Sequence, residues 1–117
     1  MKKLNLYNNS LLFKILFWIA LLVSYIAAVL PQDMAPQIGS LNDKGHHVLA
    51  FTTLSLLLRY GYSIKYWYVF FLLLGYGIFI EISQLFAINR YGDVQDVLAD
   101  TVGIFTGLTL HRYLKKF

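Results

Sequence analysis

The feature that most limits the fold is an almost unbroken apolar stretch from Leu11 to Leu30, which only Lys14 and Ser24 interrupt. An α-helix rises about 1.5 Å per residue, so a helix of about twenty residues crosses a bilayer core of roughly 30 Å. Lys14 lies near one end of the stretch, where its aliphatic stem can carry the ammonium group to the membrane interface. The stretch therefore predicts a first membrane-spanning helix.

A cleaved signal peptide is the alternative interpretation of this stretch, because Lys2 and Lys3 resemble the basic start of such a peptide. Cleavage needs small residues two positions apart after the apolar core. Ala28 and Ala35 are each preceded, two positions earlier, by a large or charged residue. We therefore expect the first helix to be retained.

Three more apolar segments follow, separated by polar connections. Hydrophobic residues make up 58% of the 117-residue chain and charged residues only 14%, which is too little charge for the surface of a soluble domain of this size. Pro31 to Asn42 contains both prolines and is expected to be a loop, after which Asn42 or Asp43 caps the second helix. The sequence predicts one all-α domain, an integral membrane four-helix bundle, with spans at about residues 11–30, 44–62, 66–87 and 93–114.

The distribution of charge predicts the orientation of these spans. Lys44 and Arg90 are expected on one side of the membrane, and the other basic residues all fall on the opposite side: Lys2, Lys3, Lys14, Arg59, Lys65, Arg112, Lys115 and Lys116. By the positive-inside rule, both termini are cytoplasmic. The acidic residues then lie on the outer side of the membrane or in the outer halves of the spans: Asp33, Asp43, Glu81, Asp93, Asp96 and Asp100.

Composition also excludes several classes of function. The net charge is +4, yet no run of Lys and Arg alternates with polar residues to follow a phosphate backbone, so no nucleic-acid partner is expected. The chain contains no cysteine, which excludes disulfides, zinc–thiolate sites and thiol nucleophiles. We expect no cofactor.

The segment from Glu81 to Gly107 carries four of the six acidic residues. Ionisable groups at membrane depth are costly and mark functional sites. On a helical wheel with about 100° per residue, one face of the fourth helix carries Asp93, Asp96, Asp100, Gly103, Gly107 and His111. The carboxylates occupy the outer half of this face, and the spacing of Gly103 and Gly107 predicts close packing of a neighbouring helix.

The third helix has a matching face, which carries Gly77, Glu81, Gln84 and Ile88. Glu81 and Asp100 are expected at similar depth on adjacent antiparallel helices, because each lies about two helical turns from the connection between them. Two close carboxylates are not both ionised without a nearby cation. The candidates for that cation are Arg90, Lys44 and His47.

The second helix places Asp43 and His47 one turn apart on one face, where the carboxylate is expected to orient the imidazole ring. Lys44 lies to one side but within reach. His46 points about 100° away from His47 and is expected to lie outside the site. A lone His47 would be an ordinary buried polar residue, but its acidic surroundings favour a functional role equally.

Taken together, these motifs match a known pattern: Asp43-Lys44-x-x-His47, then Glu81-x-x-Gln84, then Arg90 followed by Asp93, Asp96 and Asp100, and finally Gly103 and Gly107. In these motifs the chain resembles the VanZ-like membrane proteins over about residues 43–107. Where the family pattern usually has Asn four residues after the position of Asp96, this chain has Asp100, which adds an acidic group.

The resemblance implies a small bacterial envelope protein of the cytoplasmic (inner) membrane. It also implies a link to antibiotic resistance, because some relatives are associated with reduced sensitivity to teicoplanin-type glycopeptides. It supplies no reaction, so neither the resemblance nor the sequence decides whether the protein is an enzyme.

The preferred hypothesis is an outward-facing pocket that binds a polar or anionic head group, from a lipid-linked cell-wall precursor or a lipid-tailed glycopeptide. Lys44 and Arg90 would bind phosphate or carboxylate groups. Carboxylates and Gln84 would bind amides or hydroxyls. The expected ligand-binding residues are Asp43, Lys44, His47, Glu81, Gln84, Arg90, Asp93, Asp96 and Asp100.

An intramembrane enzyme acting on a lipid head group is the second hypothesis. Glu81 or Asp100 would be its general acid or base, His47 the other proton-transfer partner, and Arg90 would hold developing negative charge. These three acid–base residues are the candidates for catalysis.

Two further hypotheses concern cations and packing. Glu81, Asp96 and Asp100, with His47 as a further ligand, could form a divalent-cation site in which oxygen ligands favour Mg, Ca or Mn over zinc. Alternatively, basic side chains only neutralise buried acids and hold the bundle together. The bilayer is the expected environment in each case, and a lipid-facing bundle this small is a candidate homo-oligomer.

Overall fold

The computed structural model describes residues 10–30, 43–87 and 94–114. Within these ranges the fold is all-α and contains no strand. Its four helices are α1 (Ser10–Val29), α2 (Asp43–Gly61), α3 (Tyr66–Leu85) and α4 (Val94–Leu114). Each helix coincides with one of the predicted spans to within a few residues, so the predicted all-α, four-helix fold is confirmed.

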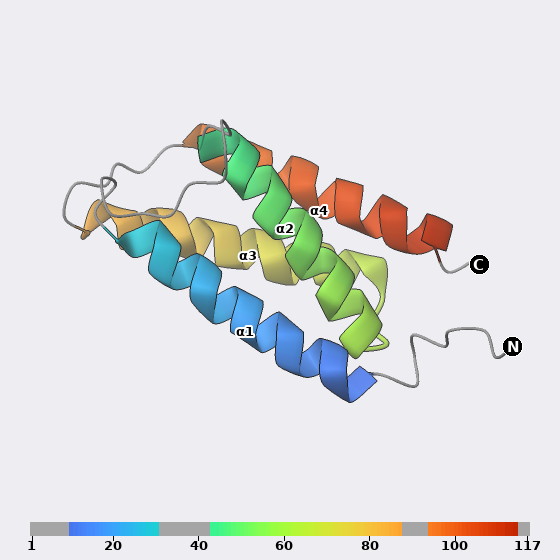
Figure 1. Cartoon of the computed structure of the whole chain (residues 1–117). Helices are drawn as coiled ribbons and strands as arrows, with labels where there is room; N and C mark the ends of the chain where they lie inside the picture. Colours follow the sequence, from blue (N-terminus) through green and yellow to red (C-terminus); the bar gives the residue numbers. More distant parts are fainter. Residues whose placement is uncertain (1–9, 31–42, 88–93, 115–117) are drawn as a thin grey trace, which may run out of the picture.

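The helices alternate in direction along the bundle (Figure 1). α4 packs mainly against α2, and α1 packs against α2 and, less closely, against α3. Within the described ranges α1 and α4 do not touch, whereas α2 and α3 each contact all three other helices. α2 is the most closely packed element of the bundle. The described hydrophobic core draws on all four helices, with α2 and α3 contributing equally: Phe17, Phe51, Leu54, Leu58, Val69, Leu73, Ile80, Ile104 and Leu108.

Two glycines of α4 allow α2 and α4 to approach closely. A Cβ atom at Gly103 would lie 2.6 Å from the carbonyl oxygen of Val48, and one at Gly107 would lie 2.7 Å from that of Thr52 and overlap Ser55 Oγ. Backbone atoms cannot move aside as side chains do. The small residues therefore set the distance between the two helices, as small residues do in membrane helix pairs.

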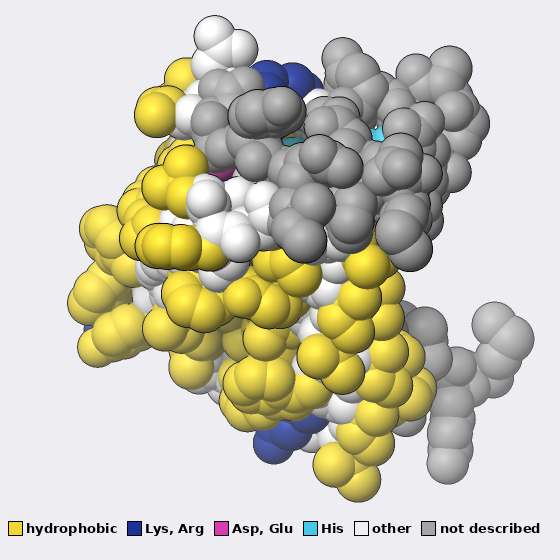
Figure 2. Space-filling model, turned by 90° about the vertical axis from the view of Figure 1, so that its left-hand side faces the viewer, with side chains coloured by type: hydrophobic (Ala, Val, Ile, Leu, Met, Phe, Trp, Pro, Cys, Tyr) yellow, Lys and Arg dark blue, Asp and Glu magenta, His cyan; other side chains and the backbone are white. Residues whose placement is uncertain are grey.

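The outer surface of the bundle is strongly apolar. α1 and α3 are each long and apolar enough to cross a membrane, judged by length and composition. Phe17 is the one buried side chain of α1, and Leu11, Leu22 and Trp18 each expose more than half of their surface. Figure 2 views the bundle from the end at which α1 and α3 stop. Hydrophobic side chains cover most of the described surface in this view, with only small charged areas. Such a surface suits a lipid environment; insertion of all four helices, the single-domain organisation and the orientation stay predictions.

The two ends of the bundle carry opposite charge. We call the end at which α1 and α3 stop and α2 and α4 start the acidic end; its described charged side chains include Lys44, His47, Glu81, Asp96 and Asp100. The opposite, basic end carries Lys14, Arg59, Lys65 and Arg112, and no acidic residue is described there. This segregation follows the charge pattern on which the predicted orientation rests.

Candidate functional site

Five polar side chains from three helices gather at the acidic end. Lys44 and His47 lie in the first turns of α2, Glu81 near the end of α3, and Asp96 and Asp100 in the first turns of α4. Figure 1 shows why: α2 and α4 begin at the same end of the bundle at which α3 stops. One polar atom each of His47, Glu81 and Asp96 lies within 4.8 Å of the other two.

His47 is the centre of this cluster. Its Nδ1 lies 2.6 Å from Asp100 Oδ1, and its Nε2 lies 3.6 Å from Asp96 Oδ2. Since a carboxylate oxygen accepts, Nδ1–H is the donor, and Nε2 of the neutral ring then carries a lone pair. The Nε2–Oδ2 distance is too long for a hydrogen bond. Asp100 therefore fixes the ring with Nε2 turned toward Asp96.

The two carboxylate oxygens of Asp96 face different partners. Oδ1 accepts a hydrogen bond from the ammonium group of Lys44 and forms an ion pair with it, and Oδ2 faces His47. The Asp96 side chain is nearly buried, whereas the Lys44 side chain remains 35% exposed. Lys44 can therefore partly neutralise Asp96 and still reach a ligand from outside the cluster.

Asp100 is completely buried, and Gly77 of α3 makes the room for it. A Cβ atom at Gly77 would lie 2.6 Å from Asp100 Oδ2. This oxygen has no hydrogen-bond partner among the described residues. A buried carboxylate oxygen without a donor is costly, so its retention calls for an explanation beyond packing.

Gln84 lies one turn beyond Glu81 on the same buried face of α3. Its Nε2 donates to the carbonyl oxygen of Ala28 at 3.0 Å, and its Oε1 is buried with no partner in the described part of the chain. Tyr25 of α1 also donates to Ser83 Oγ at 3.0 Å. Polar contacts thus tie the end of α1 to the helix that carries Glu81.

The structure changes one detail of the predicted site, the depth of Glu81 relative to Asp100. Asp100 lies against Gly77, and Glu81 lies close to Asp96 instead of level with Asp100. The expected register counted from Ile88, but α3 ends at Leu85. The described partner of His47 Nδ1 is Asp100, and the suggested contact between Asp43 and His47 stays a prediction.

The side chains of three residues of the expected site are not described. Arg90 and Asp93 lie outside the described residues. Asp43 opens α2, but its side chain is not described. The remaining expected residues of the cluster are all brought to the acidic end.

The helical spacing places Gly77 on the buried face of α3, as the structure confirms, but does not identify it as part of the site. The available signal was its spacing of one helical turn from Glu81, since a glycine on an interior face marks a close approach.

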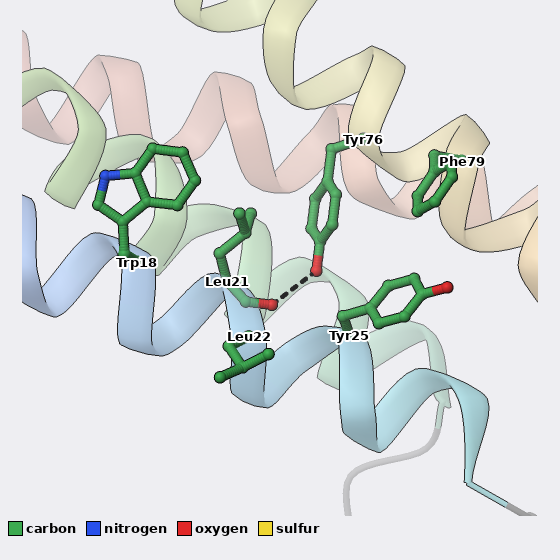
Figure 3. A pocket seen from close by; sticks show the side chains of 6 residues that line it. All are labelled: Trp18, Leu21, Leu22, Tyr25, Tyr76 and Phe79. Atoms are coloured by element: carbon green, nitrogen blue, oxygen red, sulfur yellow. Dashed lines mark hydrogen bonds between the residues drawn. The ribbon is translucent and has the colours of Figure 1, made fainter.

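An apolar groove lies between α1 and α3, separate from the polar cluster (Figure 3). It measures about 430 Å³ and is lined by Trp18, Leu21, Leu22, Tyr25, Tyr76 and Phe79. The polar atoms of this lining are already used: Tyr76 donates to the Leu21 carbonyl oxygen, and Trp18 donates to Tyr62. The groove offers a hydrocarbon surface and no reacting group.

The comparison with known protein families agrees with the motifs described above. A family model described as VanZ/LLP1 matches residues 3–115, nearly the whole chain. No curated protein and no solved structure matches the chain. The resemblance inferred from the motifs is thereby confirmed. The chain belongs to the VanZ/LLP1 family, a family of membrane proteins.

Proposed function

We propose that this protein is a multi-pass protein of the bacterial cytoplasmic membrane that binds the head group of a lipid-linked molecule at its acidic end. The observation that carries the proposal is the meeting of His47, Glu81 and Asp96, from three helices, within 4.8 Å of one another. With both termini in the cytoplasm, this end faces outward.

A binding role explains the cluster better than a purely structural one. Removing carboxylates from water is costly, and apolar residues of similar size often stabilise a fold at least as well as a buried ion pair. Glu81 is 9% exposed and Asp100 is fully buried, so both bear this cost. Ionisable residues kept at such depth in membrane proteins commonly serve ligand or ion recognition.

The family sets the class of ligand that we propose. VanZ-like proteins are linked, at the level of the family, to glycopeptide resistance. Glycopeptides act on lipid-linked cell-wall precursors, and teicoplanin-type members carry a lipid tail themselves. We infer that the head group comes from one of these two, with Lys44 and Arg90 as its basic contacts.

A second candidate function is acid–base catalysis on the same head group. The 2.6 Å contact between Asp100 and His47 favours it, because a carboxylate that fixes an imidazole ring prepares the other ring nitrogen to accept a proton. Among the described residues, no Ser or Thr hydroxyl forms a hydrogen bond with His47.

The test compares single variants in cells whose reduced sensitivity to teicoplanin depends on this protein. Glu81→Gln, Arg90→Ala and Asp96→Asn each remove one charge of the expected site. We expect normal protein levels and loss of the phenotype. A lipid species that accumulates only in the variants, seen by mass spectrometry, would favour the enzyme; loss of protection with unchanged lipids would favour binding.

His46→Ala is the matched control, because it changes the neighbouring histidine and leaves His47 in place. If all three charge variants accumulate normally and leave the phenotype unchanged, both functions are wrong.

A further inference from the structure

We propose that His47, Glu81 and Asp96 hold one divalent metal ion, and that this ion connects the acidic end to a phosphate of the bound head group. The second part of this inference rests on the proposed function. The first part, the ion site, stands on the geometry of the described residues alone.

Charge is the first argument. The described cluster contains three carboxylates, from Glu81, Asp96 and Asp100, against the single ammonium group of Lys44. An anionic head group that entered this cluster would meet net repulsion. A divalent ion neutralises the local charge and supplies the contact that a phosphate needs.

Ligand geometry is the second argument. With metal–ligand bonds of about 2.0–2.2 Å, neighbouring ligands of one ion lie roughly 3.0–3.5 Å apart. His47 Nε2 and Asp96 Oδ2 are 3.6 Å apart, and both are acceptors when the ring is neutral. Glu81 brings a carboxylate oxygen within 4.8 Å of both residues' ligand atoms. Small movements of the three side chains would bring all three ligand atoms within bonding distance of one ion.

Buried acceptor oxygens without a hydrogen-bond donor are the third argument. Two buried acceptor oxygens flank Glu81 along α3: Asp100 Oδ2, which lies against Gly77 one turn before it, and Gln84 Oε1, nearly one turn after it. Neither has a donor within the described residues, and Asp100 and Gln84 are 0% and 2% exposed. An interior with surplus acceptors and a surplus of negative charge is stabilised by a cation.

The contact between Asp100 and His47 also fits a metal ligand. A histidine that binds a metal through one ring nitrogen usually donates its other N–H to a carboxylate, which fixes the ring and raises its basicity. Here Asp100 accepts from Nδ1, and Nε2 faces Asp96. Asp100 is thus a positioning residue for His47.

The ligand types indicate which ions fit. One imidazole nitrogen with two carboxylates favours Mn²⁺, Fe²⁺ or Zn²⁺, whereas Mg²⁺ and Ca²⁺ prefer oxygen ligands alone. The oxygen-rich ligand set expected from the sequence, with His47 as a further ligand, favours Mg, Ca or Mn over zinc. The placement of His47 Nε2 beside Asp96 changes that order.

The ion site is tested with Mn²⁺ as the probe. The full chain, purified in detergent and freed of ions by a chelator that is then removed, is titrated with MnCl₂ while free Mn²⁺ is followed by electron paramagnetic resonance. We expect about one Mn²⁺ per chain, and a loss of affinity of about tenfold or more in each of His47→Ala, Glu81→Gln and Asp96→Asn. His46→Ala should bind as the wild type does.

Circular dichroism and size-exclusion chromatography identify any variant that fails to fold. The ion site is then judged on the Mn²⁺ affinities of the variants that fold. The ion site is wrong if the wild type binds no stoichiometric Mn²⁺ up to millimolar concentration. It is also wrong if His46→Ala loses as much affinity as His47→Ala.

The link to the head group needs a second measurement, with phosphatidylglycerol as an anionic probe and phosphatidylcholine as the control lipid. Native mass spectrometry should show phosphatidylglycerol bound to the Mn²⁺ form and released by chelator. Binding that survives the chelator contradicts the bridging ion and leaves the proposed function standing. Stoichiometric Mn²⁺ binding without any lipid preference supports the ion site and counts against the head-group function.

Discussion

At the scale of single residues, the site depends on how one imidazole ring is held. Asp100 fixes His47 from α4, and Gly77 of α3 provides the space in which Asp100 lies. Neither residue is one of the three proposed ion ligands. Their effect on binding therefore passes through the orientation of His47, and it can be separated from their effect on stability.

Replacing Asp100 tests this orientation. Asp100→Leu removes the acceptor of His47 Nδ1–H, and we expect Mn²⁺ affinity to fall by about 10–100-fold. Asp100→Asn keeps an acceptor oxygen and has the residue that the family pattern usually carries, so it should recover most of that loss. The same Mn²⁺ titration measures both variants. Equal affinity in Asp100→Leu and Asp100→Asn would show that the contact does not orient the ring.

Gly77→Ala tests the space around Asp100. The added Cβ would lie 2.6 Å from Asp100 Oδ2, so the carboxylate must move and its contact with His47 weakens. We expect lower Mn²⁺ affinity with only a modest change in stability, because a side-chain end moves more cheaply than backbone. Gly75→Ala is the control, since nothing lies within 4 Å of a Cβ there. Similar affinities of the two variants would contradict this account.

The sequence predicted most of these residues, but not their pairings. Helical spacing placed Asp96, Asp100 and Glu81 on interior faces, because a period of about 3.6 residues determines the face without tertiary information. The pairing of Asp100 with His47 depends on the relative shift of α2, α3 and α4. That shift depends on where α3 ends and on how closely α2 and α4 approach, which helical spacing does not contain.

At the scale of helices, the α2–α4 contact positions two of the three helices that carry the site residues. Gly103 and Gly107 let the helices approach, and Thr52 Oγ1 donates to the Gly103 carbonyl oxygen at 3.2 Å. The Gly-x-x-x-Gly spacing predicted close packing from the sequence. Its partner surface, Val48 to Ser55 of α2, could not be predicted, because apolar residues occur all along that helix.

Gly107→Ala should separate α2 and α4. The new Cβ would overlap Ser55 Oγ and lie 2.7 Å from the carbonyl oxygen of Thr52, which is backbone and cannot rotate away. Overpacking of this kind costs about 1–3 kcal/mol, which should appear as a lower midpoint of thermal unfolding in detergent. Gly75→Ala again serves as the control and should unfold at or above the wild-type temperature. An unchanged midpoint in Gly107→Ala would mean that the helices are not closely packed there.

At the scale of the whole molecule, the outstanding prediction is the orientation in the membrane. The helix ranges could be predicted because each helix is long and polar connections separate one helix from the next. The orientation follows from charge alone, and the basic end is predicted to be cytoplasmic. Because the chain has no cysteine, single introduced cysteines report on each end without background.

Phe86→Cys and Ser63→Cys place a thiol at opposite ends of the bundle, at positions that are exposed in the structure. A membrane-impermeant thiol reagent added to intact cells should label Phe86→Cys and should label Ser63→Cys only after permeabilisation. Labelling in the reverse pattern would place the acidic end in the cytoplasm. It would also remove the proposed access to an outer head group.

The most direct test of the central claim asks whether His47, Glu81 and Asp96 form one binding site for an anionic lipid head group. The measurement is native mass spectrometry of phosphatidylglycerol on the Mn²⁺-loaded wild type and on Asp96→Asn, with His46→Ala as the control. We predict one bound lipid on the wild type and on His46→Ala, and its loss from a folded Asp96→Asn. Undiminished binding to folded Asp96→Asn would contradict the claim.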